Sequence, residues 1–276
     1  MRFLESLLYG LFSGLAEFLP VSTPAHQALC MQLFGARQRE PLRDLFVHIA
    51  LMVALLHAAK SLFGRLKREK LLKTHASRSK LRHATGKSLL DLRVVRTAAL
   101  PMMLMLLFYI GTGRWEAKPA VIAVFMIING IILIIPEYMR HGNKDARSFS
   151  VAESVAMGVV SGLSVLPGIS RVGGCISAST ACGADRQNSV NWALMLTVPA
   201  LGLYMGVDVI NMFVIGFGGL TFLGFLGYLV SAVMAYLSGY FSVLMLRFLA
   251  DKAGYGAFAY YSWGAALFMF VLYLIT

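Results

Sequence analysis

A short stretch near the start of the chain places reactive side chains around a break in an apolar segment. Four of them lie within ten residues that include Pro20: Glu17, Ser22, Thr23 and His26. A charged side chain at the centre of a membrane helix costs about 2.5–3.5 kcal/mol on insertion scales, so such residues usually serve a function. A carboxylate, two hydroxyls and an imidazole can bind a cation, hydrogen-bond to phosphate oxygens or transfer protons.

A second stretch, in the middle of the chain, resembles the first. Each contains Ser-Gly-Leu, then Leu-Pro, and then a serine nine residues after the first one. In the second stretch these residues include Ser161, Pro167 and Ser170, and Arg171 follows directly. We expect the two stretches to meet and to form one site.

The composition is that of an integral membrane protein. Of the 276 residues, 58% are hydrophobic and only 14% are charged, and the mean hydropathy is +0.71. A soluble domain has roughly 25% charged residues. The apolar runs are long enough for membrane-spanning helices of about 20 residues. An all-α integral membrane protein is therefore the expected fold class.

The net charge of +12 is concentrated in one hydrophilic connection. Residues 60–96 contain twelve lysines or arginines against two acidic residues, a net charge of +10. The positive-inside rule predicts that this connection is cytoplasmic, where it can contact anionic lipid headgroups. This distribution argues against nucleic acid as a partner, and we expect none.

The cysteines and the other histidines give weaker signals. Cys30, Cys175 and Cys182 are too few and too scattered for a disulfide framework or a metal motif, so we expect small core residues. His48 and His57 lack the polar neighbours that accompany His26, and we expect structural roles for both.

Breaks and apolar runs divide the chain into two halves of the same plan. The first half, residues 1–137, is expected to contain a re-entrant hairpin at 1–36, spans at about 42–62, 92–112 and 118–137, and a basic cytoplasmic loop at 63–91. The second half, residues 151–276, is expected to contain a re-entrant hairpin at 151–184 and spans at about 188–207, 219–246 and 255–276.

The two halves are expected to run in opposite directions through the membrane. If residues 60–96 are cytoplasmic, the first hairpin enters from outside, the second enters from inside, and the C-terminus lies outside. The result is an inverted-topology repeat of about six spans, with two hairpins that meet near the midplane. Gly/Pro-broken segments at corresponding places in such a repeat indicate a central binding site.

The two breaks predict an anion site. Half-helices that begin near Thr23 and Ser170 would direct unpaired backbone N–H groups at the centre, and Arg171 adds a forked cation suited to phosphate oxygens. Alternatively, Arg171 pairs with Glu17 and locks the hairpins together, and both descriptions hold if a substrate replaces the pair. His26 lies one turn after Ser22 and Thr23, so it can share their helix face as a nucleophile, a general acid or base, or a phosphate donor.

These stretches resemble the motifs of the undecaprenyl-diphosphate phosphatase family, the bacitracin-resistance type of membrane enzyme. The segment 17–26, EFLPVSTPAH, is similar to the family's E-F-L-P-[IV]-S-S-[ST]-G-H. The segment 166–175, LPGISRVGGC, is similar to L-P-G-x-S-R-S-G-[AS]-[TS]. Further similarity runs along nearly the whole chain.

The resemblance implies a fold, an activity and a site. The family removes the terminal phosphate of undecaprenyl diphosphate at the outer face of the plasma membrane, with a divalent cation, Mg²⁺ or Ca²⁺, and so recycles the lipid carrier for cell-wall synthesis. It implies that Glu17 helps to hold the metal or to activate the nucleophile. The residues expected in catalysis are Glu17, Ser22, Thr23, His26 and Arg171, and those expected to bind the diphosphate are Gly168, Ser170, Arg171 and Gly173.

Several positions depart from the family motifs. Ser13 stands where the family has an acidic or amide residue, Val172 replaces a serine, Cys175 replaces a threonine or serine, and Pro24-Ala25 replaces a hydroxyl-Gly pair. Loss of one carboxylate weakens a site for Mg²⁺ or Ca²⁺.

Two other functions are therefore open. One is a transporter or flippase for polyprenyl phosphate that uses the same pocket, and the other is a purely structural membrane subunit, which leaves the polar motifs unexplained. A homodimer is also possible, because small residues such as those in Gly224-Phe-Leu-Gly227 serve helix packing within or between protomers.

Overall fold

The protein is built from helices, as expected. The computed structural model describes residues 3–34, 40–75, 91–111, 118–139, 142–144, 146–216, 221–252 and 254–275, and within them it contains eleven α-helices and no strand beyond a single bridge between Lys144 and Ala184. Five of the described helices are long and apolar enough to cross a membrane: Pro41–Ala58, Pro119–Glu137, Arg186–Val214, Phe222–Ala250 and Gly256–Leu274. The all-α membrane class is therefore confirmed.

The helices occur in the expected order, but the helix at the predicted span 92–112 is not among these five, and the division into two repeats stays a prediction. The first half contains α1 (Phe3–Phe18), α2 (Thr23–Phe34), α3 (Pro41–Ala58), α4 (Lys60–His75), α6 (Leu92–Gly111) and α7 (Pro119–Ile134), which ends in a short 3₁₀ turn at Ile135–Glu137. The second half contains a 3₁₀ turn at Ala146–Ser148, α8 (Val151–Gly162), a 3₁₀ turn at Leu163–Val165, α9 (Arg171–Ala181), α10 (Arg186–Ile215), α11 (Phe222–Lys252) and α12 (Gly256–Ile275).

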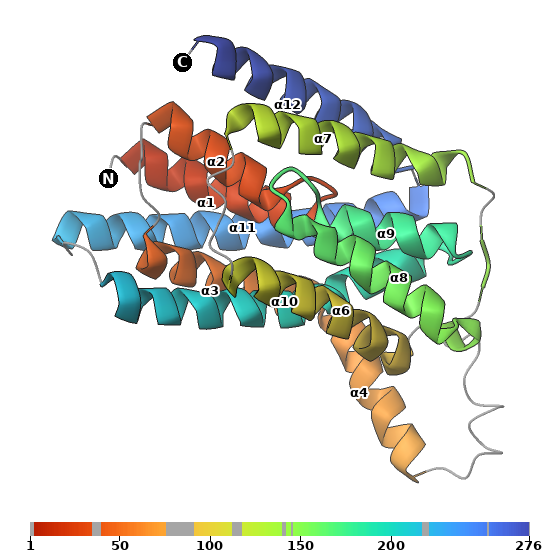
Figure 1. Ribbon diagram of the computed structural model, residues 1–276. Helices are drawn as coiled ribbons and strands as arrows, with labels where there is room; N and C mark the ends of the chain where they lie inside the picture. Colours follow the sequence, from red (N-terminus) through yellow and green to blue (C-terminus); the bar gives the residue numbers. More distant parts are fainter. Residues whose placement is uncertain are drawn as a thin grey trace.

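Several boundaries differ from the prediction: α10 extends to Ile215 and α11 to Lys252, beyond the predicted ends at 207 and 246, and the first span ends early. The span expected at 42–62 ends at Ala58, and α4 continues into the hydrophilic connection, so residues 63–75 are helical and not loop. The lysines, arginines and leucines of this segment are good helix formers, which explains a helix without an apolar span. Figure 1 shows α4 projecting away from the bundle. Residues 76–90 of the predicted loop lie outside the described residues.

Two helical hairpins approach each other from opposite ends of the molecule. In Figure 1, α1 and α2 enter from one side, α8 and α9 enter from the other, and their turns meet in the middle. Each turn lies at a proline, Pro20 in the first hairpin and Pro167 in the second, because proline cannot continue the helix before it.

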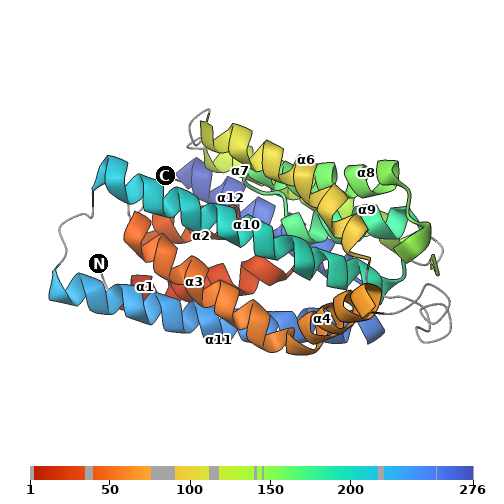
Figure 2. The same cartoon turned by 90° about the horizontal axis from the view of Figure 1, so that it is seen from below.

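The contacts between the two halves come in corresponding pairs. Helix α1 of the first hairpin packs against α11, and helix α8 of the second hairpin packs against α6. The pairs α3–α10 and α7–α12 join the halves directly, and Figure 2 shows α3 lying between α10 and α11. This exchange of partners is what a two-fold repeat would produce. The opposite orientation of the halves in a membrane stays a prediction.

Corresponding glycines allow the closest of these contacts. A Cβ on Gly10 of α1 would lie 2.1 Å from the Ser231 carbonyl oxygen of α11, and a Cβ on Gly158 of α8 would lie 2.0 Å from the Ala98 carbonyl oxygen of α6. Each glycine belongs to a Gly-xxx-Gly pair, with Gly14 and Gly162 as the second members. Such pairs let helix backbones approach within a membrane.

The two predicted cytoplasmic segments lie at one end of the molecule and the chain termini at the other. In Figure 1, α4 and the connection from α7 to α8 lie at the right, and the N- and C-termini lie at the left. This agrees with the predicted topology, which puts both termini on the face opposite the basic segment.

A matched pair of glycine substitutions tests the close helix contact. We expect Gly10→Ala to lower the free energy of unfolding by about 1–3 kcal/mol, because the new methyl group overpacks the α1–α11 contact. Gly206→Ala adds the same group in α10, where nothing lies within 4 Å, and we expect it to be neutral or slightly stabilising. Thermal unfolding in detergent compares the two, and equal melting temperatures would contradict the contact.

Candidate active site

Side chains join the two hairpin turns by hydrogen bonds to backbone groups of the turns. The Gly168 N–H donates to Ser22 Oγ at 2.9 Å. Asn129 of α7 contacts both turns, since its Nδ2 donates to the Pro20 carbonyl at 3.3 Å and its Oδ1 accepts from the Ser170 N–H at 2.9 Å. The predicted meeting of the two stretches is therefore confirmed. Asn129 was not predicted, although an amide within an apolar span is a signal that could have identified it.

The two glycines predicted to bind substrate have other contacts. Gly168 has φ +127°, and a Cβ there would lie 2.6 Å from Phe125 Cβ, so only glycine fits the turn. The Gly173 N–H donates to Ser170 Oγ at 3.1 Å, the hydrogen bond by which Ser170 caps α9. Both backbone N–H groups are thus engaged within the hairpins.

A buried ion pair links the hairpins. Arg171 Nη2 donates to Glu17 Oε1, and Thr23 Oγ1 donates to Glu17 Oε2 at 2.9 Å. Glu17 and Arg171 are only 5% and 6% exposed. The alternative that Arg171 pairs with Glu17 is therefore confirmed, and the helix N-termini at Thr23 and Arg171 meet at this pair.

The Arg171 guanidinium can donate a further hydrogen bond. Arg171 Nη1 lies 3.5 Å from the Tyr204 hydroxyl, and Nη2 lies 3.4 Å from Thr197 Oγ1. Its Nε is buried and has no hydrogen-bond partner among the described residues. A buried unsatisfied donor on a cation is costly unless a ligand satisfies it, and phosphate oxygens are well suited to do so.

A cavity of about 100 Å³ opens beside the pair, large enough for several water molecules. Its polar lining comes from α1, α2, α3, α9, α10 and the turn of the second hairpin: Glu17, Thr23, Gln27, His48, Ser164, Ser170, Arg171, Tyr204 and Asp208. Apolar side chains such as Val165 and Leu106 complete the wall. Four of the predicted site residues therefore line one cavity: Glu17, Thr23, Ser170 and Arg171.

His26 does not line this cavity. Its Nδ1 is 2.7 Å from the Ser22 carbonyl oxygen, and its Nε2 is 2.7 Å from the Tyr261 hydroxyl. It lines a different and mainly apolar pocket between α2, α7 and α12, beside Met126 and Phe268. The predicted shared face with Ser22 and Thr23 is not found, because the His26 ring turns toward α12 while Thr23 turns toward Glu17.

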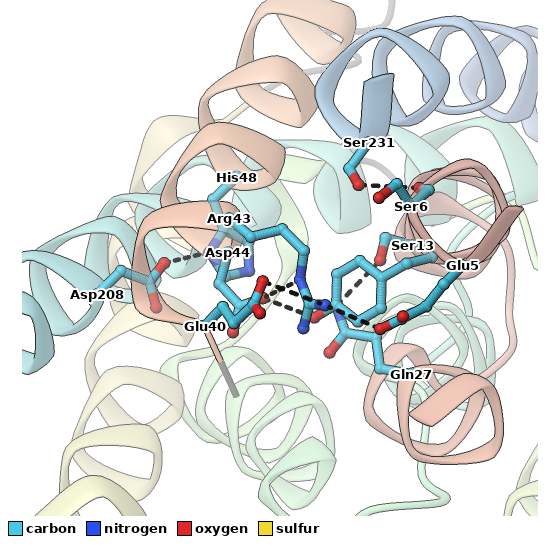
Figure 3. A network of polar contacts seen from close by, with 11 residues as sticks. Glu5, Ser6, Ser13, Gln27, Glu40, Arg43, Asp44, His48, Asp208 and Ser231 are labelled. Atoms are coloured by element: carbon cyan, nitrogen blue, oxygen red, sulfur yellow. Dashed lines mark hydrogen bonds and ion pairs between the residues drawn. The ribbon is translucent and has the colours of Figure 1, made fainter. Parts of the chain in front are cut away.

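The cavity contains a histidine–carboxylate pair that sequence reasoning missed. His48 Nδ1 of α3 lies 2.5 Å from Asp208 Oδ2 of α10, and both residues line the cavity (Figure 3). The two residues are far apart in the sequence, so no local motif joins them. The carboxylate of Asp208 within an apolar span was the available signal.

A second buried cluster of charges holds α1 against α3. Arg43 is fully buried, and its guanidinium lies 3.8 Å from Glu5, 3.9 Å from Glu40 and 3.5 Å from Asp44 (Figure 3). The Tyr9 hydroxyl donates to Asp44 Oδ1 at 2.7 Å. Asp44 lies one turn before His48 on α3, so this cluster adds negative charge next to the cavity.

The departures from the family motifs have local explanations. Ser13 is fully buried, and its Oγ accepts from Gln27 Nε2 at 3.1 Å. Val172 and Cys175 lie in the hydrophobic core, as does Cys30, which agrees with the expected role of the cysteines. An amide–hydroxyl pair thus occupies the position where an acidic residue was expected.

A divalent cation fits this donor set only together with a substrate. The described residues contain no group of three acidic, histidine or cysteine side chains that could hold a metal, and both Glu17 oxygens are already engaged. Mg²⁺ is commonly bound by one or two carboxylates plus substrate phosphates. Glu17 can supply such a carboxylate once phosphate oxygens have replaced it as partners of Arg171.

A double-mutant cycle tests the buried pair. We expect Glu17→Gln and Arg171→Met each to lower the free energy of unfolding by about 3–5 kcal/mol, because each leaves a buried charge uncompensated. The double variant should lose less than the sum of the two. As a control, Lys144→Met removes half of the partly exposed Lys144–Glu153 pair and should cost about 0–1 kcal/mol. Additive losses in thermal unfolding would contradict the pairing.

The amino-acid sequence was compared with those of known proteins. Residues 6–268 match the family described as bacitracin resistance protein BacA. Similar relatives named undecaprenyl-diphosphatase come from Carboxydothermus hydrogenoformans (27% identical, over 99% of this chain and 98% of the relative), Methanobrevibacter smithii (26%, over 98% and 98%) and Treponema denticola (28%, over 95% and 94%). The match covers nearly the whole chain, and this protein belongs to the bacitracin resistance protein BacA family.

Proposed function

We propose that this protein hydrolyses undecaprenyl diphosphate to the monophosphate and inorganic phosphate. The observation that carries the proposal is the cavity in which Glu17, Thr23 and Arg171 meet at the N-termini of α2 and α9. The relatives named undecaprenyl-diphosphatase support the substrate. The product lipid would return to cell-wall synthesis as a carrier.

The diphosphate would bind by exchanging partners with the buried pair. Two helix N-termini present positive dipole ends, and Arg171 presents a fork of donors that includes the unpartnered Nε. The substrate's oxygens would replace Glu17 on Arg171, and the hydroxyls of Thr23 and Ser170 would donate further hydrogen bonds. Phosphoryl transfer depends chiefly on positioning and charge stabilisation, which these groups supply.

We further propose that the released Glu17 carboxylate holds the divalent cation, Mg²⁺ or Ca²⁺, together with the diphosphate oxygens. When bound, the cation would neutralise negative charge that develops during phosphoryl transfer. Gln27 and Ser13 would stand beside this site without adding charge, so the cation should bind more weakly than in a site with a second carboxylate.

We propose that substrate reaches the cavity from the predicted outer face of the plasma membrane. Gln27, His48 and Asp208 lie within about two turns of the end of α2, the start of α3 and the end of α10, respectively. These helix ends lie at the end of the molecule that carries the chain termini (Figure 1). A lipid diphosphate arriving from that face would meet the cavity before the hairpin turns. Association of two copies stays a prediction.

Phosphate release from undecaprenyl diphosphate by the purified protein tests the proposal. We expect release that stops with chelator and that Arg171→Met lowers at least about 10²–10³-fold, as loss of a stabilising donor does in other enzymes. Arg247→Met is the matched control, because Arg247 contacts Ala58 and Ser61 outside the cavity. Unchanged release in Arg171→Met would contradict the site. Absence of release by the wild type, with the lipid still bound, would favour the carrier alternative.

A further inference from the structure

The cavity holds a second polar pair, which lies outside the two segments 17–26 and 166–175. His48 and Asp208 come from different helices, α3 and α10, and face each other across 2.5 Å. Asp208 is 1% exposed, so its carboxylate is almost entirely removed from solvent. A buried carboxylate in contact with an imidazole is the arrangement that fixes a histidine for proton transfer.

The hydrogen bond determines which nitrogen of His48 is available. An ionised carboxylate only accepts hydrogen bonds, so Nδ1 carries the proton that Asp208 Oδ2 accepts. In the neutral ring, Nε2 then has a lone pair. None of the described residues forms a hydrogen bond with Nε2, and the ring contributes to the cavity wall.

His26 offers no such lone pair. Its Nδ1 donates to the Ser22 carbonyl oxygen, so in the neutral ring Nε2 accepts from the Tyr261 hydroxyl. Both ring nitrogens are therefore engaged, and the ring stacks on Tyr261 with a centroid distance of 5.7 Å. Of the two histidines, only His48 lines the cavity of Glu17 and Arg171, and only its ring has a nitrogen, Nε2, without a hydrogen bond to the described residues.

Tyr204 connects His48 to the anion site. The centroid of its ring lies 5.4 Å from that of the His48 ring, and its hydroxyl lies 3.5 Å from Arg171 Nη1. The charged and titratable groups around His48 are Asp208 and Tyr204 on α10, Asp44 on α3, Glu17 on α1 and Arg171 on α9. A phosphate held by Arg171 and a water beside it would therefore lie in the small cavity that His48 lines.

We propose that His48 is the general base of the hydrolysis and that Asp208 is its positioning residue. This inference rests on the proposed phosphatase activity. Water attacks the terminal phosphorus, its oxygen forms the new P–O bond, and one of its protons goes to His48 Nε2. The phosphoanhydride bond breaks, and its electron pair leaves with the bridging oxygen on the lipid monophosphate. The imidazolium, stabilised by Asp208, then returns its proton to solvent.

The test compares histidines on the same helix. His48→Gln keeps an amide that can donate to Asp208 but removes the base, and we expect kcat to fall about 10²–10⁴-fold, the usual contribution of general base catalysis. The acid limb of the pH profile of kcat/KM should disappear as well. His57→Gln is the control, because His57 pairs with Tyr236 outside the cavity, and it should keep both kcat and the limb.

A double variant tests whether Asp208 acts by positioning His48 or only by helix packing. If Asp208 acts through His48, Asp208→Asn should lower kcat in the wild-type background and have no further effect in His48→Gln. Binding of the monophosphate lipid and elution as a single species show that each variant is folded. If the wild type releases phosphate and His48→Gln has the same kcat, the role of His48 is overturned while the proposed function stands. A wild type that releases none would instead overturn the proposed function.

Discussion

The structure depends on satisfying the backbone of two broken hairpins inside an apolar bundle. Each turn frees carbonyl and N–H groups at a depth where water cannot pair with them, and irregular backbone is tolerated there only when other protein groups bond to it. The two turns solve this together, through Ser22 and Gly168 and through the amide of Asn129, which accepts from one turn and donates to the other. The meeting of the hairpins is thus a requirement of their own backbone, and the site arises at the place where they meet.

The same junction explains how charge is kept in the apolar interior. Glu17 and Arg171 compensate each other, and the helix N-termini beside them favour an anion. A buried pair of this kind contributes little net stability, because desolvation offsets most of the attraction. In the proposed mechanism this pair is exchanged: an incoming diphosphate takes the place of Glu17 on Arg171, and the divalent cation then compensates the released Glu17 carboxylate. A resting ion pair and a substrate site are therefore two states of one arrangement.

Much of the fold could be predicted because its signals are local. Apolar runs located the helices, and Pro20 and Pro167 located the turns, since both effects act within a few residues. The extension of α4 was missed because a hydrophilic helix has no apolar run to reveal it. The grouping of Glu17, Thr23 and Arg171 could be predicted from the two motifs, which share a pattern of breaks.

The rest of the site depends on contacts that no local pattern encodes. His48 and Asp208 meet only because α3 packs against α10, and Asn129 acts only because α7 crosses both turns. The orientation of His26 is decided by α12, which supplies Tyr261 near the other end of the chain. Spacing placed His26 near Thr23 on the helix, but the partner of its ring came from elsewhere.

The exchange of Glu17 for diphosphate on Arg171 is the central claim, and equilibrium binding of a non-hydrolysable methylene-bridged analogue of the lipid diphosphate tests it most directly. The measurement is made in chelator, so that the carboxylate competes for Arg171 without holding a cation. Exchange predicts that Glu17→Gln binds the analogue more tightly than the wild type, because the internal competitor is gone, and that Arg171→Met binds it more weakly. Weaker binding by Glu17→Gln, or equal binding by Arg171→Met, would contradict the account.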